Sequence, residues 1–83
     1  MNREEVKLSK REDLDEINLT DLRSVVVFYY TNLTCVHLYD KNSNLMYLAF
    51  NSSENIGGFL LRCKLQGIVV RKTKINSRRS TWF

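Results

Sequence analysis

Three side chains with catalytic or metal-binding chemistry lie within six residues of one another, in the order Cys35, His37 and Asp40. A cysteine beside an imidazole can act as a nucleophile when a third group orients the base. On a strand, Cys35 and His37 would project from the same face, with Tyr39 next in line. The sequence offers neither a third triad member nor a second cluster of metal ligands. We therefore interpret the pair as part of a half-buried sheet face and expect no catalysis, no metal and no cofactor.

The two cysteines do not form a recognisable functional pair, because 27 residues separate Cys35 from Cys63. This spacing fits neither a zinc knuckle nor a redox pair, and two cysteines do not make a disulfide-dense secreted scaffold. The first residues mix both charge signs and lead into no secretory signal, and no apolar run approaches the roughly 20 residues that cross a bilayer. We therefore expect two buried thiols, no contact with a membrane and a cytoplasmic location.

A glycine pair, Gly57-Gly58, follows a predicted strand and opens a predicted helix, where exposed backbone amides can hold an anion. The segment lacks the Lys and Ser/Thr of a P-loop and the third Gly of a dinucleotide-binding fingerprint. We therefore interpret the pair as a tight turn into the helix or a point of close helix–sheet packing, and not as a nucleotide site.

Basic residues are concentrated at the C-terminal end of the sequence. Residues 55–83 contain seven Lys or Arg and no Asp or Glu, whereas residues 1–54 contain six Lys or Arg and nine Asp or Glu. Cations attract phosphate groups, and aromatic rings beside them can stack on bases. On a strand, Lys72 and Lys74 would project from one face and Arg71 from the other. The candidate binding residues are Arg62, Lys64, Arg71, Lys72, Lys74, Arg78, Arg79 and Trp82.

This basic segment has three interpretations. We expect a non-enzymatic binding module whose C-terminal strand and turn contact nucleic acid or a nucleoprotein. A second interpretation of the segment is that it binds an acidic protein partner. The alternative function is a small inhibitor or adaptor, of the kind that mobile elements encode, that acts on a host protein complex through the acidic N-terminal helix and the exposed aromatic and sheet edges. The third interpretation is structural, because Lys on an edge strand also prevents edge-to-edge aggregation. The sequence contains none of the standard nucleic-acid motifs, and unpaired sheet edges would allow a homodimer.

The first elements that position these residues follow from a cap and from residue propensities. Ser9 and Glu12 have the spacing of a capping box, which predicts a short helix over residues 10–17. Leu14 and Ile17 would form its apolar side. Residues 24–31 (SVVVFYYT) are almost all β-branched or aromatic, which favours a strand, although apolar residues there also recur at helical spacing.

A β-hairpin is predicted next, because two apolar or alternating runs, residues 34–40 and 45–50, flank a polar connection. The connection, residues 41–44, is rich in Asn and Ser, whose side chains stabilise turns locally. The hairpin would place Cys35 and His37 on one of its two strands.

A main helix is predicted over residues 54–66, with Ser52 or Ser53 as its cap and Gly67 just beyond its end. A strand over residues 68–75 follows, and residues 78–83 are expected to return as a short edge strand. The predicted apolar face of the helix is Ile56, Phe59, Leu60 and Cys63.

Length and composition limit the fold to one modest core. The chain has 83 residues, of which 43% are hydrophobic and 11% aromatic, and its net charge is +4. A chain of this size has no room for a deep cleft between two lobes. The sequence therefore predicts an α+β fold in a single small domain, residues 1–83. Its small antiparallel sheet of three to five strands would be covered by the main helix, with the short N-terminal helix beside it.

Overall fold

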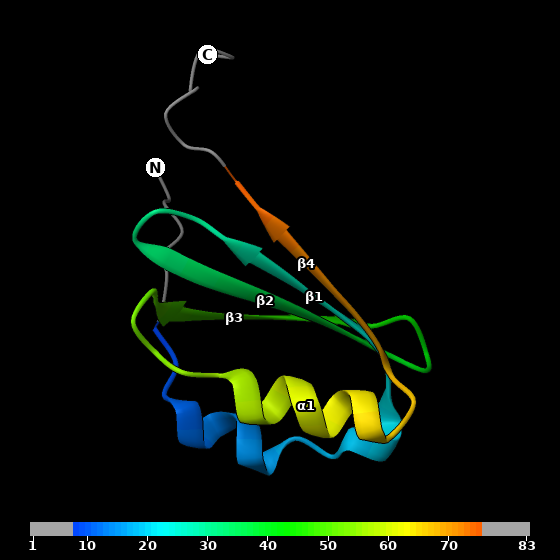
Figure 1. The fold of residues 1–83 in the computed structure, drawn as a ribbon. Helices are drawn as coiled ribbons and strands as arrows, with labels where there is room; N and C mark the ends of the chain where they lie inside the picture. The colour runs from blue at the N-terminus through cyan, green and yellow to red at the C-terminus, as the bar shows by residue number, and fades with distance from the viewer. Residues whose placement is uncertain (1–7, 76–83) are drawn as a thin grey trace, which may run out of the picture.

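The computed structural model describes residues 8–75. Figure 1 shows a twisted β-sheet with the helical segments gathered on one of its faces. The fold class is therefore α+β, as the sequence predicts. In chain order the elements are the 3₁₀ helices η1 (Arg11–Glu16) and η2 (Leu19–Asp21), the strands β1 (Leu22–Tyr29), β2 (Leu33–Asp40) and β3 (Leu45–Asn51), the helix α1 (Gly57–Leu65) and the strand β4 (Val69–Lys74).

β1 is a strand in the interior of the sheet, so residue propensity prevails over helical spacing, although the strand begins two residues before the predicted range 24–31 and ends two residues before its end. Val25 and Val27 have no exposed surface, while the alternate residues Val26 and Phe28 are half-buried on the opposite side. β-Branched side chains with restricted χ1 angles pack well on a pleated surface of this kind. The neighbouring strands β2 and β4 pair with the two edges of β1.

β2 and β3 form the predicted hairpin in antiparallel register. The Asp40 carboxylate closes the turn, because its Oδ1 accepts hydrogen bonds from the backbone nitrogens of Asn42 (2.8 Å) and Asn44 (2.9 Å). Ser43 takes the left-handed conformation in this turn, with φ +70°. Because such side-chain acceptors satisfy backbone nitrogens within the turn, β2 ends and β3 begins on either side of the polar connection.

α1 lies inside the predicted range 54–66, and all four residues of its predicted apolar face are buried. Its start differs from the prediction, because neither Ser52 nor Ser53 caps it. The N-cap residue is Ile56, which makes no side-chain cap, and the preceding Asn55 satisfies the first helical amide: its Oδ1 accepts a hydrogen bond from the Gly57 nitrogen at 2.9 Å. The tight turn from Asn55 into the helix leaves little space at Gly57, where an added Cβ would lie 3.3 Å from that oxygen.

Gly67 ends α1, as predicted. It has φ +82°, the left-handed conformation typical of the residue after a helix. The Gly67 nitrogen donates to the Lys64 carbonyl and the Ile68 nitrogen to the Cys63 carbonyl, both at 3.0 Å. These two bonds form a Schellman motif, which turns the chain directly into β4.

β4 corrects the predicted antiparallel sheet, because it pairs with β1 in parallel. The strand order is β3-β2-β1-β4, and β3 points in the same direction as β1 since both are antiparallel to β2. From β3 at one edge the chain crosses β2 and β1 through α1 and returns at the other edge. One helix reverses the chain once, so β4 runs parallel to β1. A local strand pattern carries no information about this direction.

The predicted N-terminal helix is a 3₁₀ helix, η1. Its capping interaction lies one residue later than predicted, because the Lys10 nitrogen donates to Asp13 Oδ2 (2.9 Å). Leu14 is only 1% exposed and Ile17 packs against the core, so the predicted apolar side is confirmed. Asn18 ends the segment, since its side chain accepts a hydrogen bond from the Thr20 nitrogen and starts η2.

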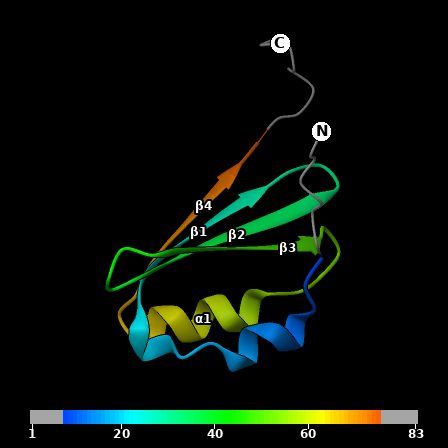
Figure 2. The ribbon, with the colours of Figure 1, turned by 180° about the vertical axis from the view of Figure 1, so that it is seen from behind.

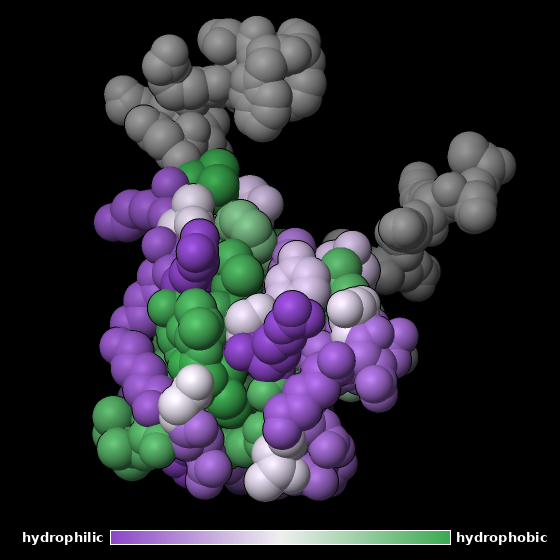
Figure 3. All heavy atoms as spheres, turned by 90° about the vertical axis from the view of Figure 1, so that its right-hand side faces the viewer, coloured by the Kyte–Doolittle hydropathy of each residue, from purple (hydrophilic) through white to green (hydrophobic). Residues whose placement is uncertain are grey.

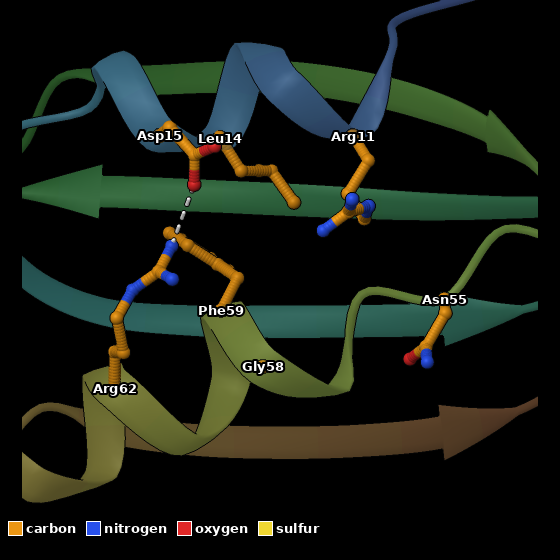
Figure 4. Close-up of a pocket in the computed structure, with 7 residues that line it drawn as sticks. All are labelled: Arg11, Leu14, Asp15, Asn55, Gly58, Phe59 and Arg62. Carbon is orange, nitrogen blue, oxygen red and sulfur yellow. Dashed lines mark hydrogen bonds and ion pairs between the residues drawn. The ribbon is translucent and has the colours of Figure 1, made fainter.

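The helical layer has two halves. Figure 4 shows η1 across the β3 and β2 side of the sheet and α1 across the β1 and β4 side. The core lies between this layer and the sheet, and Leu14, Val25, Val36, Phe50 and Phe59 are among its members. No helix in residues 8–75 is long and apolar enough to cross a membrane.

The other face of the sheet has no helix or strand of residues 8–75 over it, as the opposite views in Figures 1 and 2 agree. We call it the open face. Strand register assigns to it Ser24, Val26 and Phe28 of β1, Leu33, Cys35, His37 and Tyr39 of β2, Leu45, Tyr47, Ala49 and Asn51 of β3, and Val69, Arg71 and Thr73 of β4.

Candidate nucleic-acid interface

β4 forms one edge of the sheet in the described part of the chain, and three of its six residues are cations. Lys72 lies opposite Val27 of β1, on the side of the helical layer, whereas Arg71 lies opposite Val26 on the open face. Lys74 shares the side of Lys72, so the predicted division between the two faces is confirmed. All three side chains are exposed.

Arg62 of α1 points away from β4. Its guanidinium contacts the Asp15 carboxylate of η1 at 3.1 Å and lies 6.0 Å from the centre of the Phe59 ring (Figure 4). Both members of the ion pair are about half-exposed, so water weakens their attraction. Arg62 therefore joins the two helical segments and is not brought together with the cations of β4.

Lys64 lies on the opposite flank of α1. A step of two residues turns about 200° around a helix, so Lys64 projects from the side away from η1. Because α1 lies on the β1 and β4 side of the sheet (Figure 4), this flank of the helix faces the edge that β4 forms. We call Lys64, Arg71, Lys72 and Lys74 the basic edge. None of the four forms an ion pair with another described residue.

The remaining candidates, Arg78, Arg79 and Trp82, lie outside the described residues, as does the edge strand expected over residues 78–83. The fold nevertheless separates charge within residues 8–75. The basic edge is at β4, whereas four acids lie on the β3 side in η1, namely Glu12, Asp13, Asp15 and Glu16. The molecule thus presents a basic edge and an acidic helical flank.

Cys35 and His37 share the open face, as predicted, and their environment does not activate a thiolate. Burial raises the pKa of Cys35 and lowers the pKa of His37, so both groups favour their neutral forms. The carboxylate of Asp40 is engaged in the hairpin turn, where the hydrogen bond from the Asn44 backbone lowers its pKa. No group of three potential metal ligands occurs in the part of the chain that the structure describes.

The sheet separates the two cysteines. Cys63 belongs to the core under α1, whereas Cys35 lies on the open face, and both are free thiols. Only one of the two thiols predicted to be buried is therefore fully buried, because β2 alternates and its outer positions stay half-exposed.

Gly58 of the glycine pair lines a shallow pocket between η1 and α1 (Figure 4). Asn55 accepts the Gly57 nitrogen, and the Asp15 carboxylate occupies the same pocket beside Arg62. The Gly57 amide is thus already hydrogen-bonded and is not free to hold an anion. The interpretation of Gly57 as a tight turn into the helix fits this geometry.

The aromatic character of the open face was not part of the sequence-based site. Alternation along β2 indicated one face with Cys35, His37 and Tyr39, but only the strand register adds Phe28 and Tyr47 to it. Seen from the right-hand side of Figure 1, hydrophobic atoms form a band with hydrophilic atoms on both sides (Figure 3).

No family model, curated protein or solved structure matches the chain, so its function is inferred from its own surfaces.

Proposed function

We propose that the protein is a non-enzymatic cytoplasmic binding module that contacts nucleic acid or a nucleoprotein through the basic edge. The supporting observation is that Lys72 and Lys74 project from one side of an edge strand and Arg71 from the other, with all three side chains exposed. Free ammonium and guanidinium groups bind phosphates by releasing condensed counterions, and Arg can contact a phosphate with two parallel hydrogen bonds.

The edge suits backbone contacts better than base recognition. Lys72 and Lys74 are two residues apart on a strand, which places them about 7 Å apart along it. Lysine binds phosphate as a point charge and carries no sequence information by itself. We therefore expect binding that depends strongly on salt and weakly on sequence.

The test is a salt titration of binding to a fluorescently labelled oligonucleotide, with a variant that removes two edge charges. For Lys72→Gln/Lys74→Gln we expect weaker binding and a log–log salt slope that is smaller in magnitude by about 1.4–1.8. The matched control is Lys10→Gln/Lys41→Gln, which removes the same number of exposed cations from residues outside β4. Equal losses for the two variants, or no binding by the native protein, would contradict the proposal.

A protein partner is the second candidate, and the acidic flank of η1 is the observation that favours it, because nucleic acid would avoid this surface. Affinity purification with and without nuclease separates the two functions. One stoichiometric protein that survives nuclease treatment indicates an inhibitor or adaptor, whereas loss of all bound material indicates nucleic acid.

A further inference from the structure

Aromatic rings lie next to one another at the centre of the open face. The His37 ring is 4.7 Å from the Phe28 ring, at 55°, and 4.7 Å from the Tyr47 ring, at 88°. These rings come from three neighbouring strands, β1, β2 and β3. Tyr47 is 66% exposed, and Phe28 and His37 are half-buried. The cluster therefore offers ring surface to an external molecule without any rearrangement of the fold.

The same face connects these rings to the basic edge. Strand register places Tyr47, His37, Val26 and Arg71 in one row across all four strands. With strands about 4.8 Å apart, Arg71 lies about 10 Å from His37 along this row. Arg71 is the one formal charge among the residues assigned to the open face, which include no Asp or Glu. The row thus passes from a cation at the edge to rings in the centre.

We infer that the open face binds single-stranded nucleic acid, with unpaired bases stacked on Tyr47, Phe28 and His37 and the phosphate backbone along β4. This inference rests on the proposed function and names its ligand. Aromatic rings stack on bases of any sequence, but only where the bases are not hidden in a duplex. Arg71, at the edge of the same face, supplies the complementary charge for the backbone, whereas Lys72 and Lys74 project from the other side of β4.

A second copy of the chain is the competing occupant of this face. The charge arrangement favours nucleic acid, because stacking two such faces would bring Arg71 of each copy into an apolar surface that offers no carboxylate among its described residues. A polyanion needs no such carboxylate and satisfies the same cation.

The experiment compares binding of a labelled 12-nucleotide single strand and of the corresponding 12-base-pair duplex by fluorescence anisotropy. We expect the native protein to bind the single strand at least tenfold more tightly. Tyr47→Ala should weaken single-strand binding about 5-fold to 150-fold, the range for loss of one stacked base, and leave duplex binding unchanged. Tyr47→Phe keeps the ring and should bind like the native protein.

Met46→Ala is the matched control, because Met46 is the next residue of β3, is 51% exposed and projects toward the other side of the sheet. It should leave both affinities unchanged. Phe28→Leu, which keeps an apolar side chain but removes a ring, provides a second variant should Tyr47→Ala fail to fold.

The outcomes separate this inference from the proposed function. Equal binding of single strand and duplex, with no effect of Tyr47→Ala, overturns the inference and leaves the basic edge as the binding surface. Binding of neither oligonucleotide overturns both. Light scattering on the same samples measures the oligomeric state and so tests the second copy of the chain as the occupant. A dimer that dissociates in the Tyr47→Ala variant would also overturn the inference.

Discussion

His37 is the residue of the open face whose charge changes nearest to neutral pH. Its ring lies between those of Phe28 and Tyr47, and burial lowers its pKa below the usual 6.5. The unfolded chain therefore binds this proton more readily than the folded protein does. The contribution of neutral His37 to stability is complete above about pH 6.5 and declines as the pH falls through that value.

We predict that His37→Phe reduces the loss of stability between pH 7.5 and pH 5.0. Phenylalanine keeps a ring between Phe28 and Tyr47 but binds no proton, so the unfolding midpoint should change less over this range than in the native protein. Denaturant unfolding at the two pH values measures the difference. Asp40 titrates below this range because its pKa is lowered, so it does not obscure the result. Identical pH dependence in both proteins would show that His37 does not titrate differently on folding.

For single residues, strand alternation predicted which side chains share a face. It correctly placed Lys72 and Lys74 on one side of the strand and Arg71 on the other. It could not predict the partner of Arg62. Asp15 lies 47 residues earlier in the sequence, and the two meet only because η1 and α1 lie side by side. Local patterns contain no information about such a contact, so Arg62 was grouped with cations that it does not join.

The end of α1 decides where β4 begins, and Gly67 is its critical position. With φ +82°, Gly67 has a conformation that costs an L-residue with a side chain about 1–2 kcal/mol. We predict that Gly67→Ala lowers the free energy of unfolding by this amount, although an added Cβ would meet no atom within 4 Å. Denaturant unfolding at neutral pH measures it.

Gly58→Ala is the matched control for Gly67→Ala. Gly58 also has open space around an added Cβ, but it lies inside α1 with ordinary helical backbone angles. Alanine should leave stability unchanged or raise it by up to about 1 kcal/mol. Similar losses at both glycines would mean that the left-handed backbone at Gly67 is not what the substitution disturbs.

The elements themselves follow largely from local composition. β-Branched runs, the polar hairpin connection and the apolar face of α1 each correspond to observed structure. The direction of β4 does not, because it depends on how α1 crosses the sheet. The caps of η1 and α1 also moved by one to three residues, since several neighbouring polar side chains could accept the same backbone nitrogens.

Over the whole molecule, the distribution of charge matters more than its sum of +4. The sequence places its excess of cations after residue 54, and the fold turns this difference along the chain into a separation in space. β4 carries the basic edge on one side, and η1 carries its acids on the other. Within residues 8–75 the ion pair of Arg62 and Asp15 joins α1 to η1, and no ion pair joins the basic edge to η1.

If the basic edge binds the ligand, net charge alone should not predict affinity. We predict that Glu12→Gln/Glu16→Gln, which raises the net charge to +6, changes oligonucleotide affinity less than twofold at 0.15 M salt. Electrostatic screening acts within about 8 Å under these conditions, and both acids lie in η1, across the helical layer from β4. They avoid Asp13 and Asp15, which have structural partners.

Measurements at lower salt separate the effect of a charge's distance from the ligand from the effect of its sign. At 0.01 M the screening length grows to about 30 Å, which spans the molecule, so Glu12→Gln/Glu16→Gln should then bind more tightly than the native protein. Lys72→Gln/Lys74→Gln, with a net charge of +2, should bind more weakly at both salt concentrations. Equal and opposite changes for the two variants at 0.15 M would mean that ligands respond to total charge, and the basic edge would then have no special role.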